Sequence, residues 1–425
     1  MKKYYSECLE ETYFSDVLDN GLTIRLMPKK DYSVTYAVLA VKFGSLDNKF
    51  IPVNQNEFVE VPLGVAHFLE HKMFEMLNGE DVNNLFAEIG ADVNAYTTYD
   101  HTGYFFSTTR NLKKALTLLL DFVMNKGYTP KSIEEEKNII EQELLMYLDN
   151  PNIRLQVEAL KTLYMENLVR EDIGGTIQSV RKINKDILDL CYDNFYQPEN
   201  MCLVLVGNFD KDEIYELLKE HQKNNYGEKT SKDVKYYLET KEVNTKYQEI
   251  KMDVLIPKVS VNLKLECNNL TSRQLIVKDY ALSALMFQEF DVTSDFYQKC
   301  LHDGIINNSF DFEIVVEKNY SHILVTSDTL YPERFIEAVK ENFLRLKFVE
   351  ISKESFNGYK KITEAQILRK MNNVEYFGNM LLESYFYDIE LFDNLNIIKE
   401  LTIDDVEMVR QYFEEDAISA LVIKN

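Results

Sequence analysis

Residues 64–75 constrain this chain more than any other stretch, because they place polar side chains on a helix that should be buried. The stretch holds two of the six histidines, His67 and His71, with Glu70 directly before the second. Each helical residue turns about 100°, so these three side chains share roughly 100° of arc. The positions around them are mostly apolar, which is typical of a helix buried nearly all round: Val65, Ala66, Phe68, Leu69, Met73, Met76 and Leu77. Burying unpaired polar groups costs several kcal/mol, so these three side chains need a partner.

A divalent metal is the partner that this spacing favours. The order His-x-x-Glu-His is that of the inverted zinc-peptidase motif. Histidines at i and i+4 can bind one Zn²⁺ from the same side of a helix, and a glutamate at i+3 reaches the water on that metal. The alternative is that two satisfied core histidines lie near a glutamate by chance. Histidine is scarce here, and about one chain in a hundred of this composition would show the pattern by chance.

Zinc needs a third protein ligand, and catalysis needs a fourth position left for water. The helical pattern over 131–148 offers five glutamates: Glu134, Glu135, Glu136, Glu141 and Glu143. Seven residues make nearly two turns, so Glu136 and Glu143 lie on one stripe of this helix. A solvated acidic face explains the other three well. It explains Glu143 less well, because two leucines follow directly. The residues alone therefore rank Glu143 first among five candidate ligands, with Glu136 as its support.

Length and composition restrict the class of protein. At 425 residues the chain exceeds the size of one hydrophobic core, so two or more domains are expected. A net charge of −23 argues against nucleic acid and anionic membranes as partners. The five cysteines are odd in number and spread out, which indicates free thiols in a reducing compartment: Cys8, Cys191, Cys202, Cys267 and Cys300. No apolar run is long enough for a signal peptide or a membrane span, so we expect a cytoplasmic location.

The second half of the chain repeats the first. Residues 132–150 align without gaps on 355–373, at an offset of 223 residues. The segments 183–190 and 203–208 resemble 401–408 and 421–425, and the last of these matches at an offset of 217 residues. Helical and strand patterns mix in both halves, so we expect a duplicated α+β domain. The expected boundaries are 1–221 for the first domain, 222–246 for a polar linker and 247–425 for the second domain. The second copy has no histidine near 281–290, and Gln366 stands where the first copy has Glu143, so it should lack a metal site.

Short strands and helices are expected throughout the first half. Strands are predicted at 17–28 and 34–43, as an antiparallel pair at 93–98 and 103–108, and at 200–208. Helices are predicted at 67–77, 81–89, 110–126 and 131–148.

The order and spacing of these motifs resemble the pitrilysin–insulinase family of zinc peptidases, which includes the mitochondrial processing peptidase. The resemblance covers essentially the whole chain and is nearest to a bacterial, YmfH-type branch. It rests on the motifs at 20–22, 43–45, 64–74, 90–104, 136–143 and 196–208. It implies that His67, His71 and Glu143 bind one Zn²⁺ per chain, that Glu136 supports them, and that Glu70 moves the proton in peptide hydrolysis.

The resemblance also implies an architecture and a substrate. Each half would be a mostly antiparallel sheet covered by helices, and two chains would close around a chamber like a clam shell. Residues 94–97 match the edge strand to which an extended peptide adds through main-chain hydrogen bonds. These residues, expected to bind substrate, are Asn94, Ala95, Tyr96 and Thr97. The expected function is therefore that of a zinc metalloendopeptidase acting on extended peptides or unfolded segments.

One departure from the family pattern concerns the second half. Family members carry an arginine and a tyrosine there that help to hold the substrate, but this chain has no arginine between Arg273 and Arg334. The resemblance therefore implies a homologous partner subunit, in a heterodimer or a homodimer. A non-catalytic or processing-scaffold subunit that binds peptides without cleaving them is the alternative. The intact set of His67, Glu70 and His71 argues against that alternative, since such subunits usually lose these residues.

Overall fold

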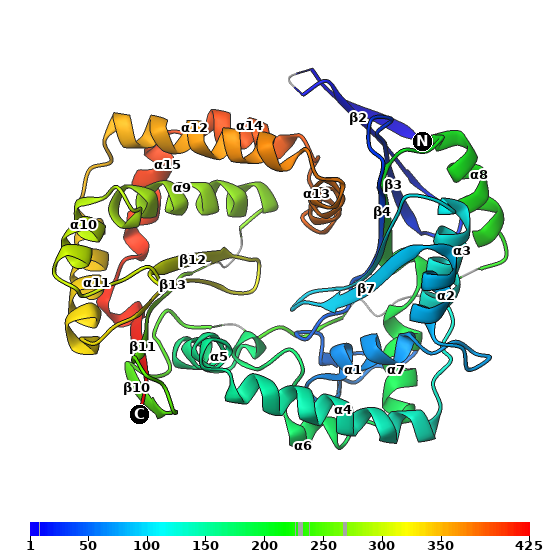
Figure 1. The fold of residues 1–425 in the computed structure, drawn as a ribbon, viewed down its shortest axis with the longest axis horizontal. Coiled ribbons are helices and arrows are strands. Elements are labelled where there is room, and N and C mark those ends of the chain that lie inside the picture. The colour runs from blue at the N-terminus through cyan, green and yellow to red at the C-terminus, as the bar shows by residue number, and fades with distance from the viewer. Residues whose placement is uncertain (8, 226, 228–232, 238, 267–269) are drawn as a thin grey trace. The chain divides into compact units, whose positions relative to one another are not determined.

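The computed structural model describes residues 1–7, 9–225, 227, 233–237, 239–266 and 270–425. The chain forms two compact units, each assembled from three separate segments (Figure 1). Unit 1 contains Met1–Leu144, Asp172–Tyr236 and Lys370–Leu391. Unit 2 contains Leu145–Glu171, Tyr237–Arg369 and Phe392–Asn425.

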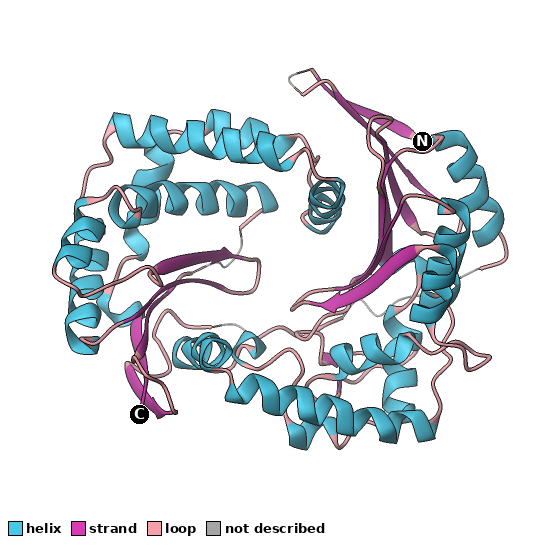
Figure 2. Cartoon of the chain, viewed as in Figure 1, coloured by secondary structure: helices cyan, strands magenta, loops and turns pink. Residues whose placement is uncertain are grey.

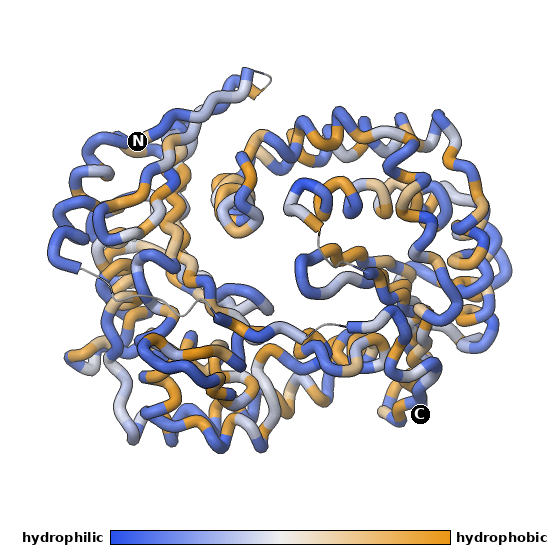
Figure 3. The backbone as a smooth tube through the Cα atoms, turned by 180° about the vertical axis from the view of Figure 1, so that it is seen from behind, coloured by the Kyte–Doolittle hydropathy of each residue, from blue (hydrophilic) through white to orange (hydrophobic). Residues whose placement is uncertain are grey.

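Unit 1 is built on a seven-stranded sheet in the order β1-β2-β3-β9-β4-β8-β7. The strands are β1 (Lys2–Ser6), β2 (Glu11–Val17), β3 (Thr23–Pro28), β4 (Thr35–Val41), β7 (Ala91–Thr97), β8 (Thr102–Thr108) and β9 (Met201–Gly207). β3 and β9 run parallel, whereas the other neighbours are antiparallel. Every residue of β4 and β9 is buried, as their unbroken apolar runs predict, and Figure 3 shows hydrophobic colour along this part of the sheet. A short pair, β5 (Lys49–Phe50) and β6 (Val59–Glu60), lies outside the main sheet.

Helices cover both faces of this sheet (Figure 2). They are α1 (Val65–Met73), α2 (Val82–Ile89), α3 (Leu112–Val123), α4 (Pro130–Asp149), α6 (Ile177–Val180), α7 (Lys185–Phe195), α8 (Lys211–Gln222) and α13 (Val374–Phe386). α1 is shorter than the expected 67–77 helix, because the chain turns back after Met73. The amide of Met76 donates to the carbonyl of Glu80, and the side chain of Asp81 then caps α2.

Unit 2 repeats the core of this arrangement with five strands in the order β10-β14-β11-β13-β12. They are β10 (Tyr247–Lys251), β11 (Lys258–Lys264), β12 (Asp311–Val316), β13 (Ser321–Asp328) and β14 (Ile418–Lys424). Strand for strand this is the order β3-β9-β4-β8-β7, and again the first pair, β10 and β14, is the parallel one. The expected α+β fold with two homologous domains is therefore confirmed.

The helices of unit 2 are α5 (Pro151–Leu163), α9 (Ser272–Phe290), α10 (Asp295–His302), α11 (Pro332–Leu346), α12 (Lys353–Lys370), α14 (Asp393–Glu400) and α15 (Ile403–Val409). α5 comes from the first half of the chain, yet it packs on β11 and β14. Its counterpart in the repeat, α13, comes from the second half and packs on β4 and β9. The two repeats have thus exchanged one equivalent helix.

This exchange means that the compact units do not follow the boundaries expected from the sequence. The expected domains 1–221 and 247–425 are continuous, whereas each unit takes a helix from the other half because its sheet is covered by that helix. The chain also changes units between Tyr236 and Tyr237, inside the expected linker 222–246. Residues 226, 228–232 and 238 of that linker lie outside the described residues.

Two composition-based expectations can be compared with the described residues. None of the helices described is both long enough and apolar enough to cross a bilayer. Cys191, Cys202 and Cys300 are buried free thiols, while Cys8 and Cys267 lie outside the described residues.

Candidate metal centre

The site is formed where α1 and α4 of unit 1 meet. α1 follows Gly64, whose φ of 83° and close approach to the carbonyl oxygen of Gly174 leave no room for a side chain. The helix places His67 and His71 one turn apart, with their rings 4.6 Å from each other. α4 brings Glu143 to both of them. Its carboxylate oxygens lie 3.9 Å from Nε2 of His67 and 3.7 Å from Nε2 of His71.

These three side chains fit a bound zinc ion. One donor atom from each lies within 4.8 Å of the other two. Zn²⁺ in a tetrahedral site, with bonds of about 2.0–2.1 Å, holds its donors roughly 3.3 Å apart. The observed spacing is slightly wider than that, and it is too long for direct hydrogen bonds. Two imidazole nitrogens and one carboxylate oxygen leave one position open, as catalytic zinc sites do.

The electrostatics of His67 agree with a role as ligand. Burial, with a smaller contribution from nearby His71, lowers the pKa of His67 to about 4. The ring is therefore neutral at pH 7, which is the form that binds metals. Its Nδ1 is buried and has no hydrogen-bond partner among the described residues. This nitrogen faces the loop at Gly174, where an added Cβ would lie 3.5 Å from it.

His71 contacts Glu136, the residue expected to support it. Its Nδ1 lies 3.0 Å from Oε1 of Glu136 and donates to that carboxylate, so Nε2 is left to face Glu143. Burial acts against the charged form of His71, but the hydrogen bond with Glu136 and the nearby carboxylates outweigh it and raise the pKa of the ring. Burial also acts on Glu136, yet hydrogen bonds from His71 and Lys72 outweigh it and lower the pKa of that carboxyl.

Glu70 lies between the metal ligands and the sheet. Its side chain is buried, and this burial raises the pKa of the carboxyl group. The hydroxyl of Thr97, at the end of β7, donates to Oε2 of Glu70 over 2.6 Å. Sequence reasoning placed Thr97 only among the substrate-binding residues and missed this bond. No sequence signal identifies it, because it depends on how β7 meets α1.

The residues expected to bind substrate lie together on β7, which is an edge strand of the unit 1 sheet. Asn94, Ala95, Tyr96 and Thr97 pair with residues 102–105 of β8 on one side, and no strand of the described chain pairs with β7 on its other side. The side chain of Asn94 is exposed, and the other three are partly buried. Their role in binding a peptide stays a prediction.

The remaining glutamates of α4 lie away from the metal ligands. Glu134 and Glu135 are exposed, as a solvated face predicts. Glu141 pairs with Arg181 over 2.7 Å.

Sequence reasoning also missed Lys72, a buried lysine directly after His71. A charged residue within the apolar surroundings of α1 is the signal that could have identified it.

This chain is similar to proteins of a known family. A model of the family described as insulinase (peptidase family M16) matches residues 58–176, and one described as the peptidase M16 inactive domain matches residues 182–363. A Bacillus subtilis protein named as the uncharacterised zinc protease YmfH is 36% identical over 419 residues, covering 98% of this chain and 97% of that protein. This chain belongs to the insulinase family, M16. It is thus a member of a family of zinc peptidases.

Solved structures agree with this M16 assignment. An M16-like peptidase from Alicyclobacillus acidocaldarius is 33% identical and superposes with a TM-score of 0.92, over 97% of this chain and 98% of that chain. A protease from Helicobacter pylori shares the fold, with 18% identity and a TM-score of 0.81 over 98% of this chain and 100% of that chain.

The second repeat of this M16 chain has other residues at the corresponding place. In unit 2, Tyr359 of α12 hydrogen-bonds to Ser283 of α9 and lies close to Asp279. Tyr359 stands at the position of Glu136 in the aligned repeat, and Asp279 and Ser283 keep the spacing of His67 and His71. Within the described residues, only unit 1 has a group of three side chains arranged to hold a metal. That the second copy lacks a metal site stays a prediction.

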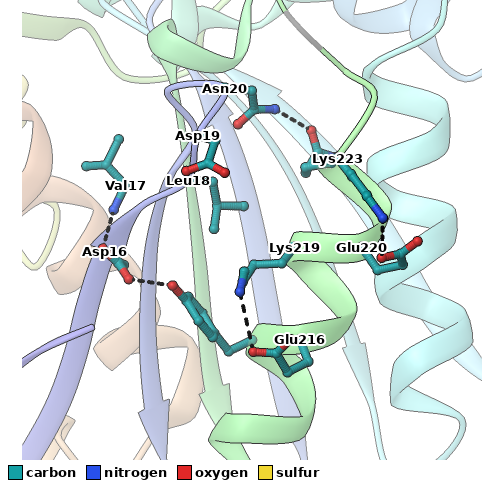
Figure 4. Close-up of a pocket in the computed structure, with 11 residues that line it drawn as sticks. Asp16, Val17, Leu18, Asp19, Asn20, Glu216, Lys219, Glu220 and Lys223 are labelled. Atoms are coloured by element: carbon teal, nitrogen blue, oxygen red, sulfur yellow. Dashed lines mark hydrogen bonds and ion pairs between the residues drawn. The ribbon is translucent and has the colours of Figure 1, made fainter.

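A separate hollow in unit 1 does not resemble a ligand site. It has a volume of about 700 Å³ and is lined by residues 16–20 and by α8 (Figure 4). Its charged side chains are engaged with one another. Lys219 pairs with Glu216, Lys223 pairs with Glu220, and Tyr215 donates to Asp16.

Proposed function

We propose that this chain is a zinc-dependent endopeptidase that hydrolyses extended peptides or unfolded segments. The observation that carries the proposal is the hydrogen bond of 2.6 Å from Thr97 to Glu70. It connects the free-edged strand β7 to a carboxylate directly beside the three candidate zinc ligands. A peptide added to the edge of β7 would have a backbone carbonyl near both the metal and a proton acceptor.

Each side chain has a distinct task in this proposal. His67, His71 and Glu143 would hold the zinc ion, and Glu136 would keep His71 in orientation. When bound, zinc supplies a Lewis acid that makes water more acidic and polarises a peptide carbonyl. Glu70 accepts the proton of the attacking water and later delivers it to the leaving amine. Burial raises the pKa of Glu70, which suits a group that both takes up and releases a proton.

The test is metal analysis followed by cleavage of an unfolded protein substrate with and without a chelator. Glu70→Gln should keep stoichiometric zinc and lower kcat by roughly 10²- to 10⁴-fold, because only the proton acceptor is removed. His67→Ala should lose zinc and activity together. Glu141→Gln is the matched control, since Glu141 lies on α4 and pairs with Arg181 at the surface.

Two outcomes would separate the proposal from its alternative. Wild-type turnover in Glu70→Gln would remove the assigned role of that residue. A zinc-loaded wild-type chain that binds unfolded peptides but leaves them intact, in the presence of every partner that purifies with it, would indicate a non-catalytic subunit instead.

We further propose that a homologous partner subunit completes the substrate site. The proposal rests on the absence of any arginine between Arg273 and Arg334, the stretch in which the family resemblance implies a substrate-holding arginine. Purification of the chain from its native host should recover a second chain of similar size, and adding that chain should raise peptide cleavage. High cleavage rates by the pure chain alone would contradict this expectation.

A further inference from the structure

Lys72 is a lysine buried inside the site region. It follows His71 on α1, and only 1% of it is exposed. Its ammonium group has three oxygen neighbours: Oε2 of Glu136 at 3.0 Å, the carbonyl oxygen of Ser132 at 3.2 Å, and the carboxylate of Glu75. An ammonium group has three donors, so all three are used. A buried charge with full pairing is costly to arrange and calls for an explanation.

The contact with Glu136 connects Lys72 to the candidate metal ligands. Oε1 of Glu136 accepts a hydrogen bond from Nδ1 of His71, and Oε2 of Glu136 accepts one from Nζ of Lys72, each over 3.0 Å. Hydrogen bonds at both oxygens fix the orientation of a carboxylate group. The order of contacts is therefore Lys72, Glu136, His71 and then Glu143, whose oxygen faces Nε2 of the same imidazole at 3.7 Å.

We propose that Lys72 is a positioning residue for the metal centre: by fixing Glu136, it holds His71 with Nε2 presented for coordination. Glu70, Glu136 and Glu143 gather around two imidazoles, so repulsion between carboxylates favours turning Glu136 away. The Lys72 ammonium opposes that rotation. The inference rests on the proposed function for the identity of the metal as zinc, and it adds a residue that orients a ligand from outside the coordination sphere.

A purely structural role is the competing explanation. Lys72 also contacts Ser132, in the first turn of α4, and Glu75, just after α1, so it could simply dock the two helices. The two roles predict different measurements. A docking residue affects the stability of the metal-free protein, whereas a positioning residue affects zinc affinity beyond any change in stability.

Lys72→Met is the decisive variant, and Lys264→Met is its matched control. Lys264 is 3% exposed, lies in unit 2, and binds the carboxylate of Glu239 and the backbone carbonyl of Glu242, whereas Lys72 binds two carboxylates and one backbone carbonyl. Zinc dissociation constants are measured by competition with a chromogenic chelator, and metal-free thermal unfolding shows that each variant is folded. Lys72→Met should weaken zinc binding by about 10- to 100-fold, the effect typical of losing a residue that orients a ligand. Lys264→Met should bind zinc as the wild type does.

The coupling through Glu136 is tested with two further variants. Glu136→Gln should weaken zinc binding to a similar extent, and the double variant with Lys72→Met should be no weaker than Glu136→Gln alone. Glu75→Gln, which leaves the contact between Lys72 and Glu136 in place, should bind zinc normally. The comparison of Glu75→Gln with Glu136→Gln remains informative even if Lys72→Met does not fold. Equal losses of zinc affinity in these two variants would show that Lys72 acts structurally.

The outcomes distinguish this inference from the proposed function. Zinc binding by Lys72→Met that matches the Lys264→Met control, or additive losses in the double variant, would overturn the role of Lys72 alone. A wild-type chain that binds zinc but cleaves no peptide in the presence of every partner that purifies with it would overturn the proposed function alone. The absorption spectrum of the Co²⁺-substituted protein gives an independent check. A misoriented His71 should change the d–d bands of the Co²⁺ ion in Lys72→Met, whereas Lys264→Met should leave these bands unchanged.

Discussion

Two charged side chains in the site region, Glu70 and Lys72, are buried together with the groups that satisfy them. Glu70 is 8% exposed and accepts a hydrogen bond from Thr97. Lys72 is 1% exposed and faces Glu136. A hydrogen bond to a charged group contributes about 1.5–3 kcal/mol, so removing one partner from such a pair should have a measurable and local effect.

Thr97→Val is predicted to impair catalysis without removing the metal. The substitution keeps the shape of the side chain but deletes the hydroxyl that donates to Glu70. Losing about 1.5–3 kcal/mol of orienting interaction corresponds to a fall in kcat of roughly 10- to 100-fold, with zinc content unchanged. Steady-state kinetics and metal analysis measure both quantities. Thr108→Val is the control, because the hydroxyl of Thr108 on neighbouring β8 donates to the carbonyl of Arg110 instead. Equal kcat values in the two variants would contradict the role of Thr97.

His322 should make the protein sensitive to acid. It is 3% exposed in unit 2, and its Nδ1 donates to the hydroxyl of Tyr164, which itself donates to the carbonyl of Ser321. Burial lowers the pKa of His322 to about 3, whereas an unfolded histidine has a pKa of about 6.5. Below pH 6.5 the unfolded chain therefore binds a proton that the folded chain does not. This lowers the free energy of unfolding by about 1.4 kcal/mol per pH unit as the pH falls toward 3.

The measurement is urea unfolding at pH 6.5 and pH 5. The wild type should lose about 2 kcal/mol more than His322→Gln over this interval, because the variant has no imidazole to protonate. His302→Gln is the control, since the side chain of His302 is 88% exposed. The same pH dependence in His322→Gln and the wild type would show that another group causes the acid sensitivity.

At the scale of elements, α5 and α13 are equivalent helices that are not interchangeable. α5 contacts its sheet through buried polar groups: the hydroxyl of Thr162 lies 2.6 Å from that of Ser419 and accepts from Asn262. α13 contacts its sheet through close packing, since Gly378 lies against the ring of Tyr36. The positions that correspond in the repeat, Leu155 for Gly378 and Leu39 for Asn262, could not make these contacts. Each helix is therefore specified for the sheet on which it packs.

Two glycine substitutions should have opposite effects on stability. An added Cβ at Gly378 would lie 2.5 Å from the ring of Tyr36, which is only 2% exposed. Gly378→Ala should therefore destabilise the protein by about 1–3 kcal/mol through overpacking. Gly358, in α12, has no atom within 4 Å of the equivalent position. Gly358→Ala should be stabilising by about 0.5–1 kcal/mol, because alanine favours the helix. Chemical denaturation measures both values, and a stabilising Gly378→Ala would contradict the packing of α13 described here.

At the scale of the whole molecule, the exchange of α5 and α13 should make the two halves of the chain depend on each other for folding. A fragment of residues 1–227 lacks α13, which covers β4 and β9. A fragment of residues 233–425 lacks α5, which covers β11 and β14. Each fragment would expose apolar strands that are buried in the intact chain.

Separately produced fragments 1–227 and 233–425 should therefore aggregate or remain partly unfolded. Co-expressed, they should purify as a stable complex that binds zinc, because each supplies the helix that the other lacks. Size-exclusion chromatography and circular dichroism report the outcome, with the uncut chain as the reference. A monomeric 1–227 fragment that unfolds cooperatively by itself would contradict this dependence.

Local sequence patterns were enough to predict the histidine pair with its glutamate and the α+β type of fold. His67, Glu70 and His71 are close in sequence, so the period of one helix brings them together. The unbroken apolar runs of β4 and β9 also needed only local patterns. Glu143 was one of five candidates until the resemblance to a known family singled it out, because no local pattern says which side of α4 faces α1.

Only the tertiary structure decided the contacts between elements far apart in the sequence. The bond from Thr97 to Glu70, the placement of Lys72 against Glu136, and the exchange of α5 with α13 all depend on how folded elements meet. Sequence periodicity reports which face of an element is buried, but it does not report against what. For that reason the histidine pair of the candidate metal centre could be predicted from the chain, while the contacts that Thr97 and Lys72 make could not.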